Sequence, residues 1–213
     1  MIYTNLQDLL KRIKANFIGQ LPGTSAQLKM APEGRDIFIN QELNPKDSAV
    51  LILFYSDNGE LKFPLIRRPA YDGHHSGQMA FPGGKRDHTD VNIIATAIRE
   101  TCEEIGICHS FIDVLGCLSP LHIPISNMVV TPVVAFTEVQ PQFIRCEKEV
   151  EEIFTVSIKE LLNPDSKKSE LWNYREKDWM VPFYLLQGQK VWGATAMILS
   201  ELEELIKQGA EQS

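Results

Sequence analysis

The chain of 213 residues has little cysteine, and its four cysteines form no C-x-x-C pair. They are Cys102, Cys108, Cys117 and Cys146. The missing pair argues against a zinc site and against a thioredoxin-like redox motif, because both use closely spaced thiols. We therefore expect four buried thiols in a protein of a reducing compartment.

Long apolar runs are also missing. None approaches the ~18 residues that a membrane-spanning helix requires. Residues 1–17 are amphipathic and charged, without the apolar centre or the cleavage site of a signal peptide, so none is expected. The sequence predicts a protein of the cytoplasm that does not enter a membrane.

Positive charge is in short supply. The chain has 21 Lys and Arg against 28 Asp and Glu, which gives a formal net charge of −7. An acidic surface argues against proteins that bind nucleic acid or anionic membranes, because these need a basic patch. A local basic cluster can still bind a small phosphorylated substrate.

Apolar periodicity and turn residues predict an α/β protein of one domain, residues 1–213, with no repeat and no linker. The core is expected over residues 48–206, and residues 1–45 supply an N-terminal helix and a loosely ordered lead-in. Pro132 favours an edge or a bulge in its strand. The predicted helices are 4–16, 93–105, 158–163 and 192–207, and the predicted strands are 48–55, 61–67, 111–118, 128–136 and 153–156, with a hairpin turn at 57–59.

The predicted helix 93–105 places Glu100, Glu103 and Glu104 close together. A helix that only needs solubility pairs such carboxylates with Lys or Arg at i+4, but Glu100 is followed at i+4 by Glu104. Carboxylates that repel one another make sense if hard cations such as Mg²⁺ bind between them. The alternative for an isolated E-x-x-E-E pattern is an acidic face in solvent. The Gly-Gly turn and acidic loop before this helix favour the metal site.

Two glycines precede the helix, Gly83 and Gly84. Without a Cβ, the backbone can approach a ligand closely and offer a carbonyl to a metal or an amide to a phosphate. An ordinary tight turn is the alternative. Asp87 and Asp90 are expected to cap the N-terminus of the helix, where negative charge is favourable.

The segment from Gly84 to Ile107 resembles the Nudix box, G-x5-E-x7-R-E-U-x-E-E-x-G-U, in which U is aliphatic. The second half, from Arg99 onward, matches except for Thr101 at an aliphatic position. The first half departs, because Asp90 stands for glutamate and the spacer to Arg99 is one residue longer. The extra residue falls in the loop or the first helical turn, so the spacing of the three glutamates is kept.

The resemblance implies a Nudix-type α/β/α sandwich around a mixed β-sheet, with the acidic helix and the C-terminal helix on opposite sides. It also implies hydrolysis of a pyrophosphate linkage with Mg²⁺ or Mn²⁺, ions that neutralise phosphate oxygens and activate water. The implied metal ligands are Glu100, Glu103, Glu104 and the carbonyl of Gly84. Arg99 would orient a carboxylate, and Arg99 and Glu103 are the catalytic residues expected within the box.

Flanking residues are similar to one subgroup, the coenzyme A pyrophosphatases, whose signature upstream of the box is L-L-T-x-R-[SA]-x3-R-x3-G-x3-F-P-G-G. Gly73 stands where that signature has its second arginine, and the adjacent His74 and His75 could contact a phosphate instead. Residues 126–136 and 191–198 are similar to later segments of the subgroup, for which core packing is the alternative. The positions that match, and that are expected to bind substrate, are Arg68, Gly77, Phe81 and Gly83.

The general base is expected outside the box. Residues 147–152, EKEVEE, resemble the E-V-x-E segment that precedes a late strand in this family. Glu149 is the first choice for the base and Glu152 the second. An acidic turn in solvent is the alternative.

The predicted reaction is hydrolysis of coenzyme A or an acyl derivative to 3′,5′-ADP and (acyl-)4′-phosphopantetheine. Arg67 or Arg68 would recognise the 3′-phosphate or the diphosphate. The nearer alternative is a Nudix hydrolase of ADP-ribose or another nucleotide derivative, and the more distant one is a Nudix-fold binding module without turnover. The expected partner is a small nucleotide, with no nucleic acid and no membrane; a homodimer is compatible with the sequence, which does not fix the oligomeric state.

Overall fold

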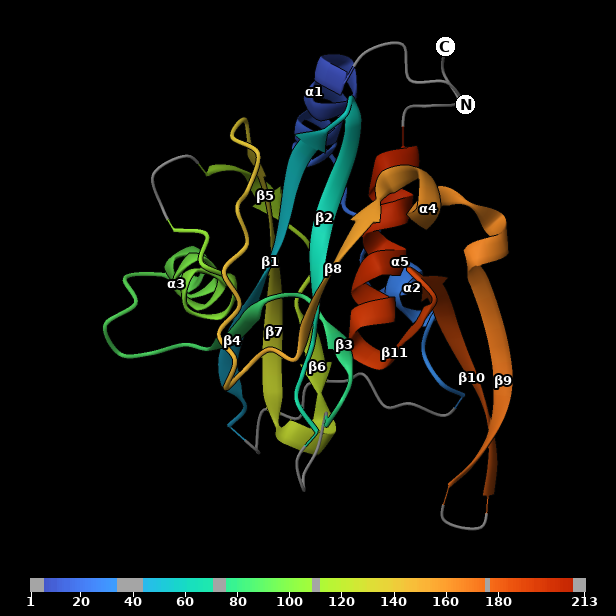
Figure 1. The fold of residues 1–213 in the computed structure, drawn as a ribbon. Coiled ribbons are helices and arrows are strands. Elements are labelled where there is room, and N and C mark those ends of the chain that lie inside the picture. The colour runs from blue at the N-terminus through green and yellow to red at the C-terminus, as the bar shows by residue number, and fades with distance from the viewer. Residues whose placement is uncertain (1–5, 34–43, 71–75, 109–111, 175–176, 209–213) are drawn as a thin grey trace.

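A computed structural model of the chain describes residues 6–33, 44–70, 76–108, 112–174 and 177–208 (Figure 1). Sheet hydrogen bonds join eight strands into one mixed sheet and three into a second, antiparallel sheet. The helices are α1 (Leu6–Asn16), α2 (Gly23–Leu28), α3 (Ile93–Ile105), α4 (Ile158–Leu162) and α5 (Gly193–Lys207), with 3-10 turns η3 (Pro124–Ser126) and η4 (Pro164–Ser166). The strands are β1 (Lys46–Asp57), β2 (Glu60–Arg67), β3 (Met79–Ala80), β4 (Gly83–Lys85), β5 (Asp113–Cys117), β6 (Leu121–Ile123), β7 (Met128–Thr137), β8 (Glu152–Ser157), β9 (Lys167–Tyr174), β10 (Lys177–Leu186) and β11 (Gln189–Trp192).

Strand β1 is the centre of the large sheet. It pairs in parallel with β7 and antiparallel with β2 and β4. Its apolar run is buried on both faces, as a central strand requires. Ala49, Leu51 and Leu53 pack on the side of α3, whereas Ile52 and Phe54 belong to the larger core cluster on the other side. Successive side chains of a strand point to opposite faces, which explains this division.

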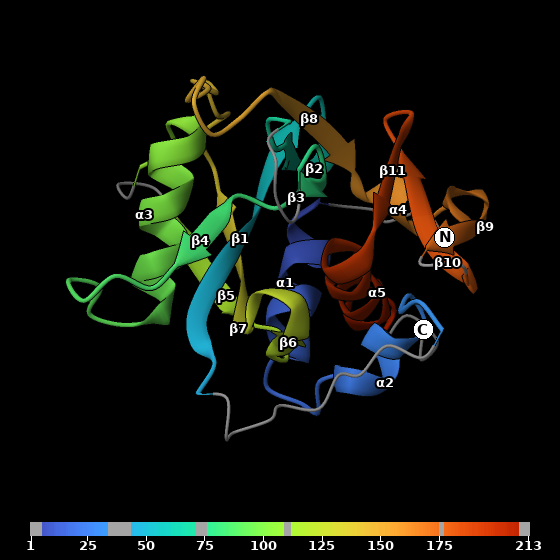
Figure 2. The ribbon, with the colours of Figure 1, turned by 90° about the horizontal axis from the view of Figure 1, so that it is seen from below.

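Helices cover both faces of the large sheet, which confirms the predicted α/β/α arrangement. Helix α3 lies on one side, and α1 and α5 lie on the other (Figures 1 and 2). Leu9, Leu10 and Ile13 carry the buried stripe of α1, as the apolar periodicity predicted. Thr4, the expected start of that helix, lies outside the described residues.

The turn between β1 and β2 follows the sequence signal closely. Asn58 has φ 51° and Gly59 has φ 76°, so both central residues of the two-residue loop are left-handed. This is the backbone of a type I′ hairpin turn, for which Asn-Gly is a preferred pair. The predicted hairpin is therefore confirmed.

Pro132 does not place β7 at an edge, and the prediction of an edge or a bulge there is wrong. Strand β7 pairs with β1 on one side and with β5 and β6 on the other. The Pro132 carbonyl accepts a hydrogen bond from the Leu118 N–H on that second side (2.9 Å), in the gap between β5 and β6. Proline has no N–H to return this bond, so the ladder along β7 is interrupted between β5 and β6. The bulge lies instead in β5, between Val114 and Gly116.

Two regions were not predicted from the sequence. Helix α2 lies in the segment that was expected to be a lead-in without regular structure, and the antiparallel sheet β9–β10–β11 follows α4. Helix α2 packs against α5. Residues Gly83–Lys85 also differ from the expected tight turn, because they form β4 and pair with β1.

The bounds of α3 agree with the predicted helix 93–105, but its N-cap does not. Asn92 is the N-cap, and its Oδ1 accepts a hydrogen bond from the Ala95 N–H (2.8 Å). The expectation that Asp87 or Asp90 caps the helix is wrong, because the Asp87 carboxylate accepts from Thr89 and the Asp90 carboxylate accepts from the Thr96 and Arg99 side chains. At the other end Gly106 has φ 77°, the left-handed backbone that ends many helices.

The expectation of four buried thiols is also wrong. Cys102 in α3 and Cys108 form a disulfide, with their Cα atoms 4.6 Å apart. The left-handed Gly106 between them turns the chain back along the helix, which brings the two cysteines together. Cys117 and Cys146 are free and half-buried. Within the described ranges, no helix is long and apolar enough to span a bilayer.

Candidate active site

A cavity of about 680 Å³ opens between β1, β4, α3 and the start of α5. Figure 2 shows how these four elements are arranged when the molecule is seen from below. One end of the cavity is acidic and is lined by Glu100, Glu104 and Glu149. The rest of the lining is mainly apolar and includes Val50, Met79, Phe81, Ile123, Met128, Val130 and Ile198.

Glu104 is the most deeply buried of the three carboxylates, with 2 % of its surface exposed. Its Oε2 accepts a hydrogen bond from the Gly83 N–H (2.8 Å). Its pKa is raised from 4.5 to about 7, mainly by burial; Glu100 and Glu149 also raise it, while the Gly83 N–H and Arg68 lower it. A carboxylate in this position gains from any cation that enters the cavity.

Glu100 lies directly against Gly84. A Cβ on Gly84 would come within 2.4 Å of the Glu100 carboxyl carbon, so no larger residue fits there without displacing the glutamate. Burial raises the pKa of Glu100, and Glu103 and Glu149 add to this, whereas Arg99 lowers it. Gly83 is restricted as well, because a Cβ there would lie 2.2 Å from the Ala49 carbonyl oxygen. The two glycines therefore let β4 pack between β1 and the carboxylates.

Arg99 connects the acidic residues of α3 to the loop before it. Its guanidinium donates to both carboxylate oxygens of Asp90 (2.9 Å each) and forms ion pairs with Glu100 (2.9 Å) and Glu103 (3.2 Å). It also donates to the Lys85 carbonyl (3.0 Å). The Asp90 carboxylate beside Arg99 has its pKa held well below the usual range. Arg99 thus orients carboxylates.

Glu103 is placed differently from Glu100 and Glu104. Its side chain is 53 % exposed, it is paired with Arg99, and it does not line the cavity. Its predicted role as a metal ligand remains a prediction, and it requires the carboxylate to leave Arg99 for the ion.

The two candidates for the general base are separated in space. Glu149 lines the cavity and acts electrostatically on both Glu100 and Glu104. Glu152 instead accepts a hydrogen bond from Arg67 (2.6 Å) outside the cavity. Geometry therefore favours Glu149, which remains a prediction as the base.

The neighbouring arginines Arg67 and Arg68 also face different surroundings. Arg67 donates to Glu151 (3.1 Å) and Glu152 (2.6 Å), and its guanidinium lies over the Phe154 ring (5.3 Å). Arg68 lines the cavity, where its charge lowers the pKa of Glu104, and its buried Nε has no hydrogen-bond partner among the described residues. Of the two, only Arg68 is available to a ligand in the cavity.

Of the remaining predicted substrate residues, some line the cavity and one does not. Phe81 and Gly83 line the cavity, and Phe81 is buried against Phe63, with ring centroids 5.9 Å apart. Gly77 does not line it; with φ 66°, it closes the loop before β3 through a hydrogen bond to the Pro69 carbonyl (3.3 Å). His74, His75 and Gly73 lie outside the described residues.

Several residues of the cavity wall were not predicted as site residues. Helix α5 contributes Ala194, Thr195 and Ile198 to the cavity wall. The Thr195 hydroxyl donates a hydrogen bond to the Met79 carbonyl (2.9 Å). The sequence segment around them had been noted, but a packing role explained it equally well. Lys85 also lines the wall, immediately after the two glycines.

The acidic end suits a divalent cation by the chemistry of its donors. Carboxylate oxygens and a backbone carbonyl are the ligands that Mg²⁺ and Mn²⁺ prefer. Burial and mutual repulsion destabilise the charged forms of Glu100 and Glu104, and a cation would relieve both effects. Within the described parts of the chain, no three His, Cys, Asp or Glu side chains are yet arranged around one point as a metal site, so the carboxylates must rotate to bind an ion.

Comparison with known proteins identifies the family. A family profile described as NUDIX domain matches residues 45–179. The chain is 38 % identical over 143 residues to a protein from Photorhabdus laumondii named Uncharacterized Nudix hydrolase NudL, covering 67 % of this chain and 76 % of that one. It is 34 % identical over 185 residues to Nudix hydrolase 15, mitochondrial, from Arabidopsis thaliana, covering 81 % of this chain and 62 % of that one.

A solved structure shares the fold. The Nudix hydrolase RenU from M. smegmatis superposes with a TM-score of 0.53 at 19 % identity, covering 76 % of this chain and 85 % of that one. Nudix hydrolases use divalent metal ions, which agrees with the donors at the acidic end of the cavity. The chain belongs to the Nudix family and is a Nudix hydrolase, an enzyme acting on nucleoside diphosphate derivatives.

Proposed function

We propose that this enzyme hydrolyses coenzyme A or an acyl-coenzyme A with Mg²⁺ or Mn²⁺, giving 3′,5′-ADP and (acyl-)4′-phosphopantetheine. The observation that carries this proposal is a cavity whose lining combines three carboxylates with a mainly apolar wall. Coenzyme A has two matching parts, a charged diphosphate and a long arm without charge. The cavity volume of about 680 Å³ falls within the roughly 300–1,000 Å³ of typical ligand sites.

The proposed metal ligands are Glu100, Glu104 and the Gly84 carbonyl, with Glu103 after it leaves Arg99. Divalent ions bound there neutralise phosphate oxygens and lower the pKa of water. The Gly83 N–H fixes the orientation of the Glu104 carboxylate, and Arg99 limits the repulsion between Glu100 and its neighbours.

The remaining groups act on the substrate. Arg68 binds oxygens of the diphosphate, because its guanidinium faces the cavity and is not committed to a carboxylate by an ion pair in the described chain. Glu149 accepts a proton from the attacking water at its carboxylate. The water oxygen then forms a bond to one phosphorus atom, and the bridging oxygen leaves with the other phosphate.

One assay tests the proposed substrate. The protein is incubated with Mg²⁺ or Mn²⁺ and, separately, coenzyme A, ADP-ribose, NADH and diadenosine polyphosphates, and the products are identified by mass spectrometry. We expect 3′,5′-ADP from coenzyme A at the highest kcat/KM. Turnover of ADP-ribose without turnover of coenzyme A contradicts the proposal and supports the alternative that the Gly73 departure suggested.

The adjacent arginines provide a matched pair of variants. We expect Arg68→Ala to lower kcat/KM by roughly 10- to 100-fold, since a hydrogen bond to a charged group contributes about 1.5–3 kcal/mol. Arg67→Ala removes the same charge one residue away, and we expect a much smaller effect on kcat/KM. Equal losses in the two variants would contradict the assignment of Arg68. The cytoplasmic location and a homodimer remain predictions.

A further inference from the structure

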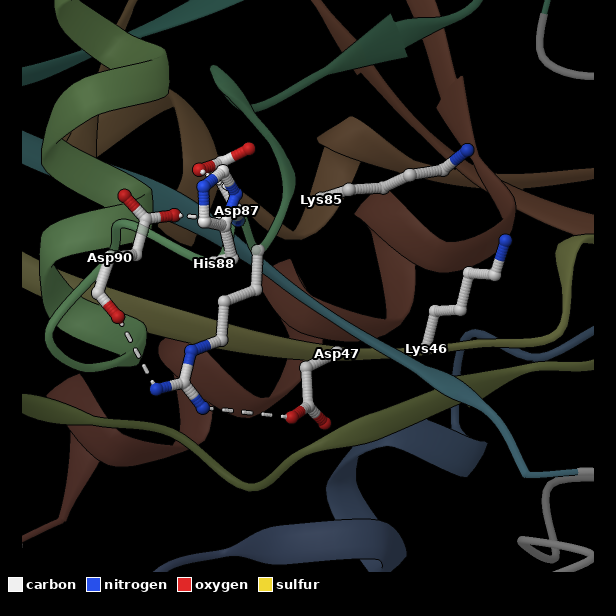
Figure 3. Close-up of a pocket in the computed structure, with 7 residues that line it drawn as sticks. Lys46, Asp47, Lys85, Asp87, His88 and Asp90 are labelled. Carbon is white, nitrogen blue, oxygen red and sulfur yellow. Dashed lines mark hydrogen bonds and ion pairs between the residues drawn. The ribbon is translucent and has the colours of Figure 1, made fainter.

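Two lysines stand at the mouth of the catalytic cavity. A shallow pocket of about 500 Å³ lies beside the cavity, and Lys46 and Lys85 line it together with Arg86 and the loop that precedes α3 (Figure 3). Lys85 lines the pocket and the cavity alike, so the two spaces adjoin at this residue. The pocket is therefore an extension of the catalytic site.

Strand register directs both lysines to the same face. Ser48 of β1 is opposite Lys85 of β4 in an antiparallel pair. Side chains directly opposite each other share a face, as do residues two apart along a strand. Lys46, Ser48 and Lys85 therefore share one face, and Ser48 lines the catalytic cavity. Asp47 also lines the pocket, where its carboxylate lies near Arg86.

The other charges of the pocket are already paired, and these two are not. Arg86 lies 3.9 Å from the Asp47 carboxylate and donates to the Asp90 carbonyl (3.3 Å). The Asp87 carboxylate accepts hydrogen bonds from the N–H (2.9 Å) and the hydroxyl (2.7 Å) of Thr89, and the Asp90 carboxylate forms an ion pair with Arg99. No acidic side chain of the described ranges forms an ion pair with Lys46 or Lys85. Figure 3 shows both side chains extended on one side of the pocket, with no interaction drawn to either.

Lys46 and Lys85 place two ammonium groups, neither in an ion pair among the described residues, beside one pocket of a chain whose net charge is −7. Mutual repulsion makes such a pair favourable only if an anion binds between them or solvent screens them. A phosphate monoester suits the pair because it carries about −1.5 to −2 charges at pH 7. Lysine binds phosphate as a point charge and needs no fixed geometry, which suits two flexible side chains.

We propose that Lys46 and Lys85 form a subsite for a phosphate monoester on the substrate, separate from the diphosphate that is hydrolysed. The subsite selects nucleotides that carry an additional phosphate, such as the 3′-phosphate of coenzyme A, over nucleotides that lack it. The inference rests on the proposed function only in taking the ligand to be the nucleotide substrate. It assigns the recognition of this phosphate to the β1–β4 rim and to neither Arg67 nor Arg68.

Binding of two product-like probes tests the subsite without any turnover. Calorimetry measures the affinities of the full chain for 3′,5′-ADP and for 5′-AMP in 50 mM and in 500 mM NaCl. We expect wild type to bind 3′,5′-ADP at least tenfold more tightly at low salt. Each exposed ammonium contributes up to about fivefold to this ratio, and salt screens the effect.

Variants locate the effect on the two lysines. We expect Lys46→Ala and Lys85→Ala each to lower the affinity ratio by roughly threefold to fivefold, and the double variant to bring it close to one. Lys168→Ala removes an exposed lysine of β9 and should leave the ratio unchanged. Circular dichroism melting shows whether each variant is folded, and Lys46→Gln and Lys85→Gln replace any alanine variant that is not.

Three outcomes decide the inference. An affinity ratio near one for wild type overturns it, as does an unchanged ratio in the double variant. A fall of the ratio in both single variants and a larger fall in the double variant, with the ratio of Lys168→Ala unchanged, supports it. The proposed function is judged separately: if coenzyme A is not cleaved although the two lysines discriminate between the probes, the proposed reaction fails and the phosphate subsite stands.

Discussion

Helix α3 and helix α5 both bury glutamates, but they surround them with different partners. In α3, burial and two neighbouring carboxylates raise the pKa of Glu104 to about 7, against the lowering effect of Arg68 and of its one backbone hydrogen bond. In α5, Glu203 is paired with Lys167 (2.8 Å) and Lys207 (2.5 Å) and accepts a hydrogen bond from the Tyr184 hydroxyl (2.7 Å). Burial raises the pKa of Glu203, but these three partners outweigh burial and lower it.

Glu201 in α5 extends the contrast. It is fully buried, and its carboxylate accepts hydrogen bonds from the Gly23 N–H (3.1 Å), the Ser119 N–H (3.1 Å) and Gln27 (2.8 Å). These bonds attach α2 and the chain before β6 to α5. A buried carboxylate with enough donors stabilises the fold, whereas one with too few donors is prepared for a ligand.

The largest effect expected from this contrast is on catalysis. Glu104→Gln should lower kcat by about 1,000-fold or more, because a metal ligand contributes several kcal/mol to stabilising the transition state. The melting temperature of the metal-free variant should not fall. Glu201→Gln makes the same chemical change in α5 and should reduce stability while the folded fraction keeps its activity. Activity of Glu104→Gln within tenfold of wild type would remove it from the metal ligands.

The next effect is on stability. Glu203→Ala should lower the free energy of unfolding by about 1–3 kcal/mol, because it removes the acceptor of the buried Tyr184 hydroxyl together with two ion pairs to partly exposed lysines. Urea denaturation measures this change. Glu204→Ala is the matched control, since its carboxylate pairs with the exposed Lys29, and we expect a loss below about 1 kcal/mol. Similar losses in the two variants would contradict the structural role of Glu203.

The two helices should also respond to pH with opposite signs. The folded pKa of Glu104, about 7, lies above its unfolded value of 4.5, so its contribution favours folding below pH 4.5 and is lost as pH rises toward 7. The loss is on the order of 3 kcal/mol. Glu203 has a lowered pKa, so its contribution is present above pH 4.5 and is lost on acidification.

Urea titrations in EDTA between pH 4 and pH 8 measure both contributions. Glu104→Gln should abolish the loss of stability toward pH 7, and Mg²⁺ should reduce that loss in wild type. A wild-type stability that does not change between pH 4.5 and pH 7, with or without metal, would show that Glu104 titrates normally.

The smallest effect concerns the end of α3. Cys108→Ser removes the disulfide to Cys102 and should lower the free energy of unfolding by about 2 kcal/mol, because the closed loop is short. A reducing agent should have the same effect on wild type. Cys117→Ser provides the control, since this thiol is free and its variant should still respond to reduction. A melting temperature of wild type that does not change on reduction would exclude a stabilising disulfide.

Helix α3 could be predicted with correct bounds because its apolar stripe, its left-handed glycine and its acidic residues are all local features. The sheet β9–β10–β11 could not be predicted, because its strands lack a clear alternation of apolar and polar residues. Leu171 and Met180 are opposite each other in β9 and β10 and both are exposed, so the apolar alternation that marks a half-buried strand is disturbed.

In the active site too, residues placed by local spacing could be predicted, and residues placed by contacts across the sheet could not. Helical spacing was enough to bring Glu100 and Glu104 into one site. Spacing alone could not separate Arg67 from Arg68, because this depends on which side chain meets Glu151 and Glu152 across the sheet. Helical spacing also could not bring Lys46 and Lys85 together. Their placement depends on the register of β4 on β1, in which positions 83 and 84 leave no room for a Cβ.

The parallel pairing of β1 with β7 has a consequence for how the chain folds during synthesis. Strand β1 is the first strand of the sheet to leave the ribosome, yet β7 joins it only after most of the chain has followed, and α5 completes the cavity later still. At usual synthesis rates this delay is on the order of ten seconds. During that time β1, which is apolar on both faces, is not yet paired with β7 or packed against α5. Nascent chains should therefore depend on chaperones. Metal and substrate can engage the complete cavity only after α5 has docked.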